Sequence, residues 1–69
     1  MAGDSLAAAL DAERARQSLS LNELARRSDQ SPGRVHSVLS GQTVNPSFGT
    51  VRAILSGLGK SLAWLDRQL

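Results

Sequence analysis

Residues 32–40 combine short hydrogen-bonding side chains with one cation at helical spacing. At 100° per residue, Gly33, Ser37 and Ser40 lie on one side of a helix here, with Arg34 and His36 at its two edges. An arginine can hold O6 and N7 of a guanine with two hydrogen bonds, and a serine hydroxyl can bond to either kind of base. A helix face that is only solvated more usually carries Glu, Lys and Gln, so the pattern indicates a face suited to polar contacts.

The sequence has no arrangement of residues typical of a catalytic or metal site. It has no nucleophile with a neighbouring base, no carboxylate pair and no phosphate-binding loop, and 69 residues leave little room for a substrate pocket. With no cysteine and one histidine, it also offers neither a disulfide nor a cluster of metal ligands. We therefore expect no enzyme, no metal, no cofactor and no small-molecule substrate.

Positive charge gathers in one stretch, although the formal net charge of the chain is only +2. Between residues 14 and 34, five arginines stand against Glu23 and Asp29, which gives a local net charge of five minus two, or +3. The five are Arg14, Arg16, Arg26, Arg27 and Arg34. A basic stripe on a small domain is typical of nucleic-acid binding.

Length and hydropathy predict one small domain over residues 1–69. A chain of this size buries only about 60% of the surface that its unfolded form exposes, so we expect a modest core and no separate sensing domain. Ser, Gly or a charged residue interrupts each apolar stretch, which predicts no membrane span. Without a recognisable signal peptide, the sequence predicts a cytoplasmic protein.

Apolar residues recur at spacings of three and four, which predicts an all-α domain. Five short helices fit: about 4–17 with Asp4 or Ser5 as cap, 20–28, 32–40, 47–59 with Ser47 as cap, and 61–69 starting at Ser61. Gly57 and Gly59 both signal the end of the fourth helix. The residues predicted to face inward from the first four helices are Leu6, Ala9, Leu10, Leu21, Leu24, Ala25, Val35, Val38, Leu39, Phe48, Val51, Ile54, Leu55 and Leu58.

Residues 20–41 have the spacing of two helices joined by a short turn. Ser20 and Glu23 form the S-x-x-E capping box, which satisfies two backbone N–H groups at a helix start. Asp29 tolerates a positive φ, Ser31 is a cap, and Pro32 suits the first position of a helix. Such a break is typical of a helix-turn-helix.

The sequence resembles the helix-turn-helix family of the Cro and phage-repressor type. The resemblance runs from about Leu10 through LSLNELARRS, the turn, SPGRVHSVLSG and NPSFGTV to LGKSL. It implies a compact five-helix domain of the lambda-repressor-like fold, whose third helix, residues 32–40, enters the major groove of double-stranded DNA. It also implies a homodimeric repressor or autoregulator on a palindromic operator, with half-sites about 34 Å apart.

The resemblance places base reading at the start and middle of the third helix, on Pro32, Gly33 and Ser37, with Arg34 and His36 adjacent. Arg34 is the first candidate for reading a guanine, and its alternatives are a phosphate contact or a solvated side chain. For His36 the alternative is a surface or phosphate-contacting imidazole. Gly33 costs a helix about 1 kcal/mol relative to alanine, but it removes a side chain where the helix would lie closest to DNA.

The resemblance places contacts to the DNA backbone on both sides of the third helix. The N–H groups of Ser20, Leu21 and Asn22 are expected to be free for a phosphate, and such contacts position a protein without reading sequence. The other implied contacts are Ser31, Ser40, Gly41, Gln42, Thr43, Asn45 and Ser47, together with Arg26 and Arg27, for which a solvated helix face is the alternative.

Three features depart from the family pattern. Leu21 stands where many members have a glutamine that grips a phosphate. Leu39 stands where members often have a glutamate paired with an arginine of the first helix, so Arg14 is expected to lack its usual partner. Pro32 and Gly33 replace longer polar side chains, which weakens the case for amide contacts to bases at the helix start.

The last helix has two apolar sides. One of them, the leucine face, carries Leu62, Leu65 and Leu69. Trp64 lies roughly 200° from the first of these leucines and points away from them. Because tryptophan is enriched at the energetic centres of interfaces, the first interpretation is a homodimer interface at Trp64, Arg67 and Gln68. The alternative is that Trp64 covers its own subunit, and it would be a core residue if the leucine face forms the dimer.

Two other functions fit the same fold: a helical protein-interaction module, and an antitoxin or controller protein. An interaction module should carry an apolar patch on the outward face of the third helix. This sequence has Gly, Ser, Arg and His there. The sequence therefore favours a sequence-specific, DNA-binding transcriptional regulator.

Overall fold

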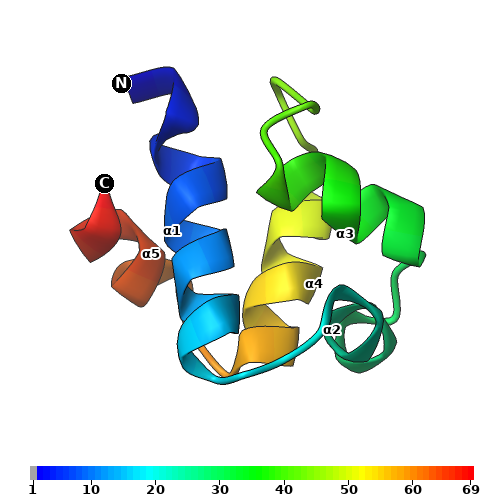
Figure 1. Ribbon diagram of the computed structural model, residues 1–69. Helices are drawn as coiled ribbons and strands as arrows, with labels where there is room; N and C mark the ends of the chain where they lie inside the picture. Colours follow the sequence, from blue (N-terminus) through cyan, green and yellow to red (C-terminus); the bar gives the residue numbers. More distant parts are fainter. Residues whose placement is uncertain (1) are drawn as a thin grey trace.

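Five helices account for most of the chain, as the apolar spacing predicts (Figure 1). In the computed structural model, which describes residues 2–69, they are α1 (Ala2–Arg16), α2 (Leu21–Ser28), α3 (Pro32–Leu39), α4 (Phe48–Leu58) and α5 (Leu62–Gln68). These residues contain no strand, and none of their helices combines the length and apolar character needed to cross a bilayer. The predicted all-α, five-helix fold is confirmed.

α1 begins earlier than the sequence predicts. It includes Asp4 and Ser5, so neither residue is the cap that precedes the helix, and that prediction was wrong. Side chains before Leu6 lie outside the described residues. From Leu6 onward the apolar spacing holds, because Leu10 is fully buried and both Leu6 and Ala9 pack against the core.

Each of the other four helices begins behind a serine, at the predicted positions. The Oγ atoms of Ser20, Ser31, Ser47 and Ser61 each accept a hydrogen bond of 3.0 or 3.1 Å from the backbone N–H three residues later. Such a cap satisfies one of the N–H groups that the first turn leaves unpaired, and it typically contributes about 1 kcal/mol. The serines therefore fix where these short helices start.

The core lies where α2, α3 and α4 meet α1 and α5. Every residue predicted to face inward from the first four helices packs there except Phe48, whose side chain is 62% exposed. Phe48 is the first residue of α4 and lies beyond the edge of the core, with the Arg52 guanidinium carbon 5.8 Å from its ring centroid. The buried stripe of α4 therefore begins with Thr50 and Val51.

α2 packs most extensively against α4, and Gly57 makes their close approach possible. A Cβ atom at this position would overlap the Ser28 hydroxyl and lie 3.2 Å from the Ser28 backbone nitrogen. Gly57 is a buried residue inside α4, so the prediction that it ends the helix was wrong. Gly59, with a left-handed φ of 71°, is the residue that ends it. The missing side chain at Gly57 thus sets how closely α2 sits on α4.

A polar network joins the end of α1 to the end of α4 and the start of α5. The Glu13 carboxylate accepts hydrogen bonds from Arg16 and from Gln17 Nε2, the latter at 2.8 Å, and lies 3.8 Å from the Lys60 ammonium. Gln17 Nε2 also donates to the Leu58 carbonyl at 2.8 Å. The hydrogen bond from Arg16, then that from Gln17, lower the pKa of Glu13 to about 2. The ionised carboxylate therefore helps to hold the α4–α5 connection against α1.

Arg14 has other partners in place of the glutamate that the family pattern supplies. Its Nε donates to Asp11 Oδ1 at 2.8 Å, and its Nη1 donates to the Leu19 carbonyl at 2.7 Å. Leu19 is a core residue directly before the cap of α2. Arg14 thus ties the α1–α2 connection to α1.

Gly57→Ala should lower the free energy of unfolding by about 1 to 3 kcal/mol, because the added methyl group forces α2 away from α4. Helix propensity alone acts in the opposite direction by about 0.5 to 1 kcal/mol. Urea unfolding followed by circular dichroism measures the change. Gly49→Ala is the control, since no atom lies within 4 Å of a Cβ added there. A Gly57→Ala variant as stable as the wild type would contradict the close contact.

Candidate nucleic-acid interface

A tight turn joins α2 to α3. Asp29 adopts the left-handed conformation, with φ 55° and ψ 40°, and its N–H turns back to the carbonyls of Ala25 and Arg26. The Gln30 N–H donates to the Ala25 carbonyl at 3.0 Å. Aspartate tolerates this conformation better than most residues, so the predicted positive φ is confirmed. The turn is followed at once by the Ser31 cap, which fixes the start of α3.

The outward face of α3 is open around Gly33. No atom lies within 4 Å of the position that a Cβ of Gly33 would occupy. Gly33 lines an open depression with Ser31, Arg34, Ser37 and Thr43. Packing within the chain therefore does not require a glycine here. The depression offers three hydroxyl groups and one exposed guanidinium to a partner.

The loop of residues 40–47 extends this surface toward α4 and rises beyond α3 (Figure 1). The Thr43 N–H donates to the Ser37 carbonyl at 3.0 Å, which folds the loop back onto α3. Arg34 lines a second depression together with Thr43, Asn45 and Ser47. Because Arg34 and Thr43 line both depressions, these residues form one continuous polar surface. Ser40, Gly41 and Gln42 are exposed at the start of the loop.

His36 lies on the other edge of α3. It is exposed and lines a separate depression with Asp11, Leu21, Leu39 and Ser40. The structure therefore does not bring His36 together with the depression at Gly33. It places His36 near Leu21, which is a predicted contact to the DNA backbone. Pro32, the first residue of α3, is exposed.

The start of α2 is partly occupied by its own cap. The Ser20 N–H donates to Glu23 Oε1 at 2.9 Å, so the prediction that this N–H is free for a phosphate was wrong. That hydrogen bond is the main reason why the pKa of Glu23 is lowered. The N–H groups of Leu21 and Asn22, the first two in the helix, have no carbonyl within the helix to bond. They remain the donors at this end.

Three of the five arginines in the basic stretch are available to a partner. Arg14 forms an ion pair with Asp11, and Arg16 forms one with Glu13, both within α1. Arg26 and Arg27 are exposed on α2 and, like Arg34, form no ion pair within the described part of the chain. These three arginines are therefore the cations of the basic stretch that can meet an anionic partner.

Sequence reasoning missed one exposed residue on the loop. Val44, between Thr43 and Asn45, has 92% of its surface exposed. A single apolar residue in a polar loop has no helical or strand periodicity around it, so the sequence carries only a weak signal. It directly follows Thr43, which lines both depressions.

The residues predicted for a dimer lie on one side of α5. Trp64 is half-buried against the core of its own chain, with the Lys60 ammonium 5.5 Å from its ring centroid. Arg67 and Gln68 are exposed, and Gln68 Nε2 donates to the Trp64 carbonyl at 3.3 Å. This placement agrees with the alternative in which Trp64 covers its own subunit.

Comparison with known proteins identifies the fold family. A family model described as helix-turn-helix matches residues 10–65, a range that contains α2, the turn, α3 and α4. No curated protein and no solved structure matches the chain. The family match confirms the resemblance to the Cro and phage-repressor type. The chain therefore belongs to this helix-turn-helix family of DNA-binding regulators.

Proposed function

We propose that this protein is a sequence-specific transcriptional regulator that reads the major groove of double-stranded DNA with α3. The observation that carries the proposal is the exposed face of α3, where Gly33, Arg34 and Ser37 adjoin Thr43 around one open depression. All the groups that line this depression are small or polar. A protein-interaction module of the same fold would present apolar side chains there, so the composition of this face favours DNA.

Arg34 is the residue proposed to read a base directly. Its backbone N–H is fixed by the Ser31 cap at 3.1 Å, while its guanidinium is exposed and can approach O6 and N7 of a guanine. Ser37 lies one turn further along the same face and bonds an adjacent base. Pro32 contacts the edge of the groove at the leading end of α3, and His36 contacts a base or phosphate on the opposite edge.

Backbone contacts on both sides of α3 set its register without reading sequence. At the start of α2, the free N–H groups of Leu21 and Asn22 and the positive end of the helix dipole favour a phosphate. Exposed arginines on the same helix add positive charge. The further proposed contacts are Arg26, Arg27, Ser31, Ser40, Gly41, Gln42, Thr43, Asn45 and Ser47.

The proposed role is that of a homodimeric repressor or autoregulator in the cytoplasm. Two copies of α3 related by a two-fold axis read the two halves of a palindromic operator, with half-sites about 34 Å apart. Occupancy of the operator then follows the concentration of the protein itself. No cofactor, metal or small-molecule substrate is part of the proposed role.

Selection of bound sequences from random duplexes should yield a palindrome. Arg34→Ala should then weaken binding to that palindrome by about 1 to 3 kcal/mol and relax the preference at one base pair in each half-site. Arg52→Ala, which removes an exposed arginine of α4 that is not among the predicted DNA contacts, is the control and should change neither quantity. A uniform loss on all sequences would assign Arg34 to a phosphate. No enrichment of any sequence would contradict the proposed function.

Gly33→Ala should stabilise the fold by about 0.5 to 1 kcal/mol, because it raises helix propensity where no neighbour is displaced. It should also weaken operator binding, because the added methyl group fills the depression that DNA is proposed to enter. Gly49→Ala is a matched control, since Gly49 is also the second residue of a helix with open space around it. Equal DNA binding by Gly33→Ala and Gly49→Ala would show that the depression is not used.

A further inference from the structure

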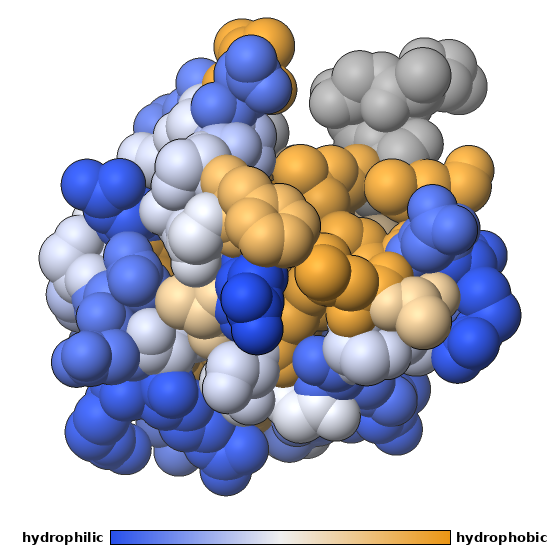
Figure 2. All heavy atoms as spheres, turned by 180° about the vertical axis from the view of Figure 1, so that it is seen from behind, coloured by the Kyte–Doolittle hydropathy of each residue, from blue (hydrophilic) through white to orange (hydrophobic). Residues whose placement is uncertain are grey.

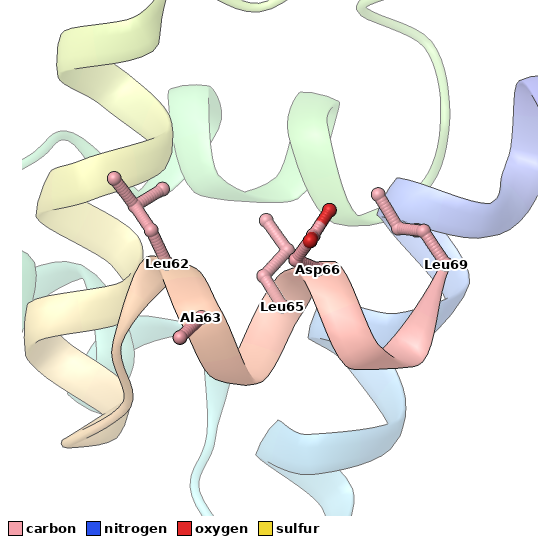
Figure 3. A pocket seen from close by; sticks show the side chains of 5 residues that line it. All are labelled: Leu62, Ala63, Leu65, Asp66 and Leu69. Carbon is pink, nitrogen blue, oxygen red and sulfur yellow. The ribbon is translucent and has the colours of Figure 1, made fainter.

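Exposed apolar side chains occupy two separate parts of the surface. Of the four large ones in the described part of the chain, Phe48 begins α4, while Leu62 and Leu69 lie at the two ends of α5. Figure 2 shows a broad apolar area on the side turned away from the view of Figure 1, and Figure 3 shows Leu62 and Leu69 along one side of α5. A face of this kind suits the subunit contact of the proposed homodimer. The fourth residue, Val44, lies on the loop of residues 40–47.

Val44 lies apart from any subunit contact made through α5. In Figure 1, α5 and the loop of residues 40–47 lie on opposite sides of α1, so a contact through α5 leaves the loop uncovered. Val44 is also the most exposed of the four apolar residues, at 92%. A single exposed apolar residue is common on a small protein. What distinguishes Val44 is its position between two residues of the proposed DNA surface.

Hydrogen bonds fix the loop on both sides of Val44. Before it, the Thr43 N–H donates to the Ser37 carbonyl at 3.0 Å. After it, the Ser47 hydroxyl donates to Thr50 Oγ1 at 2.9 Å and accepts from the Thr50 N–H at 3.1 Å. The valine side chain is itself stiff, because its Cβ atom is branched. A contact made by Val44 therefore costs little conformational entropy.

The two neighbours of Val44 belong to the proposed contacts with the DNA backbone. Thr43 and Asn45 line the depression that also contains Arg34. Val44 lies between them but does not line it, so its side chain projects from the loop. Two steps of the chain span at most roughly 7 Å, which is comparable to the distance between successive phosphates of one DNA strand. Thr43 and Asn45 can therefore contact neighbouring phosphates.

Between two successive phosphates, a DNA strand presents the carbon atoms of a deoxyribose. A valine side chain has no hydrogen-bonding group and no charge, so it cannot bind a phosphate. It can cover the sugar, which removes apolar surface of both partners from water. The C5-methyl group of thymine is the other apolar group that DNA offers, but it lies among the base edges of the major groove. The sugar is therefore the partner that fits the place of Val44 between two backbone contacts.

We propose that Val44 packs against a deoxyribose of the DNA backbone, between the phosphates that Thr43 and Asn45 contact. The inference rests on the proposed function, because it adds a contact to the same DNA surface. An apolar contact to a sugar is independent of sequence, so Val44 positions the protein and reads no base. It also releases no counterion, so its part of the affinity does not change with salt concentration. In this respect Val44 differs from the exposed arginines.

Fluorescence anisotropy of the selected operator, titrated with the full chain at several salt concentrations, tests this contact. Val44→Ala should weaken binding by about fourfold to fifteenfold, because each of the two methyl groups removed is worth about fourfold in affinity when it is buried. The slope of log K against log salt should stay the same. Val44→Thr keeps the size and branching of the side chain but replaces one methyl group, so it should weaken binding by a smaller factor. Equal binding by the wild type and Val44→Ala would overturn the proposal.

Val44→Lys adds a cation at the place where two phosphates are proposed to lie. It should release about one further counterion, so the slope of log K against log salt should become steeper by about 0.9. Ala15→Lys is the matched control, because Ala15 is exposed near the end of α1, on the side of the domain away from the loop (Figure 1). Salt largely screens charges more than about 10 Å apart at 0.1 M, so this control should leave the slope unchanged. Equal slopes for the two variants would overturn the proposal.

Three further comparisons separate the sugar from other partners of Val44. If the loss in Val44→Ala disappears when one thymine of the operator is replaced by deoxyuridine, Val44 contacts a thymine methyl group and the proposal is wrong. A loss on duplexes with two half-sites but not on those with one would place Val44 against the second subunit and also overturn it. A wild type that binds no duplex would contradict the proposed function itself. A wild type that binds duplexes exactly as Val44→Ala does would contradict this contact alone.

Discussion

The approach of α2 to α4 at Gly57 is the contact on which the rest of the domain depends. α2 carries the turn and α3, so its distance from α4 decides where the recognition helix stands relative to the loop of residues 40–47. That loop in turn supplies Thr43 to the depression at Gly33. A small change between two buried helices would therefore displace the groups proposed to meet DNA.

Two glycines serve opposite purposes in this chain. Gly57 is needed because neighbouring atoms leave no room for a side chain, whereas Gly33 has open space around it and weakens α3 without any benefit to packing. A destabilising residue that the fold does not require is best explained by what binds there. On this reading, α3 lacks a side chain where the DNA lies closest, and Arg34 reads from the adjoining edge.

Local patterns predicted most of the fold, because serine caps and apolar spacing act over a few residues. Ser20, Ser31 and Ser47 marked the helix starts correctly. Phe48 was misassigned because its spacing fits the stripe of α4, although the core does not extend that far. The burial of Glu13 escaped prediction because two of the contacts that enclose it come from distant parts of the chain. Its partner Lys60 lies far along the sequence, and Gln17, which donates to Glu13, also donates to the distant Leu58 carbonyl. The sequence could name candidate site residues one by one, but which of them share a depression depends on how the loop of residues 40–47 folds back onto α3.

The central claim is that a polar, cationic surface around α3 binds the DNA backbone and reads its bases. The most direct measurement is the affinity for the selected operator as a function of salt concentration. Neutralised phosphates release counterions, so the account predicts a linear fall of log K with log salt, with a loss on the order of a thousandfold between about 50 and 200 mM for about six contacts. An affinity that does not change with salt would contradict the account.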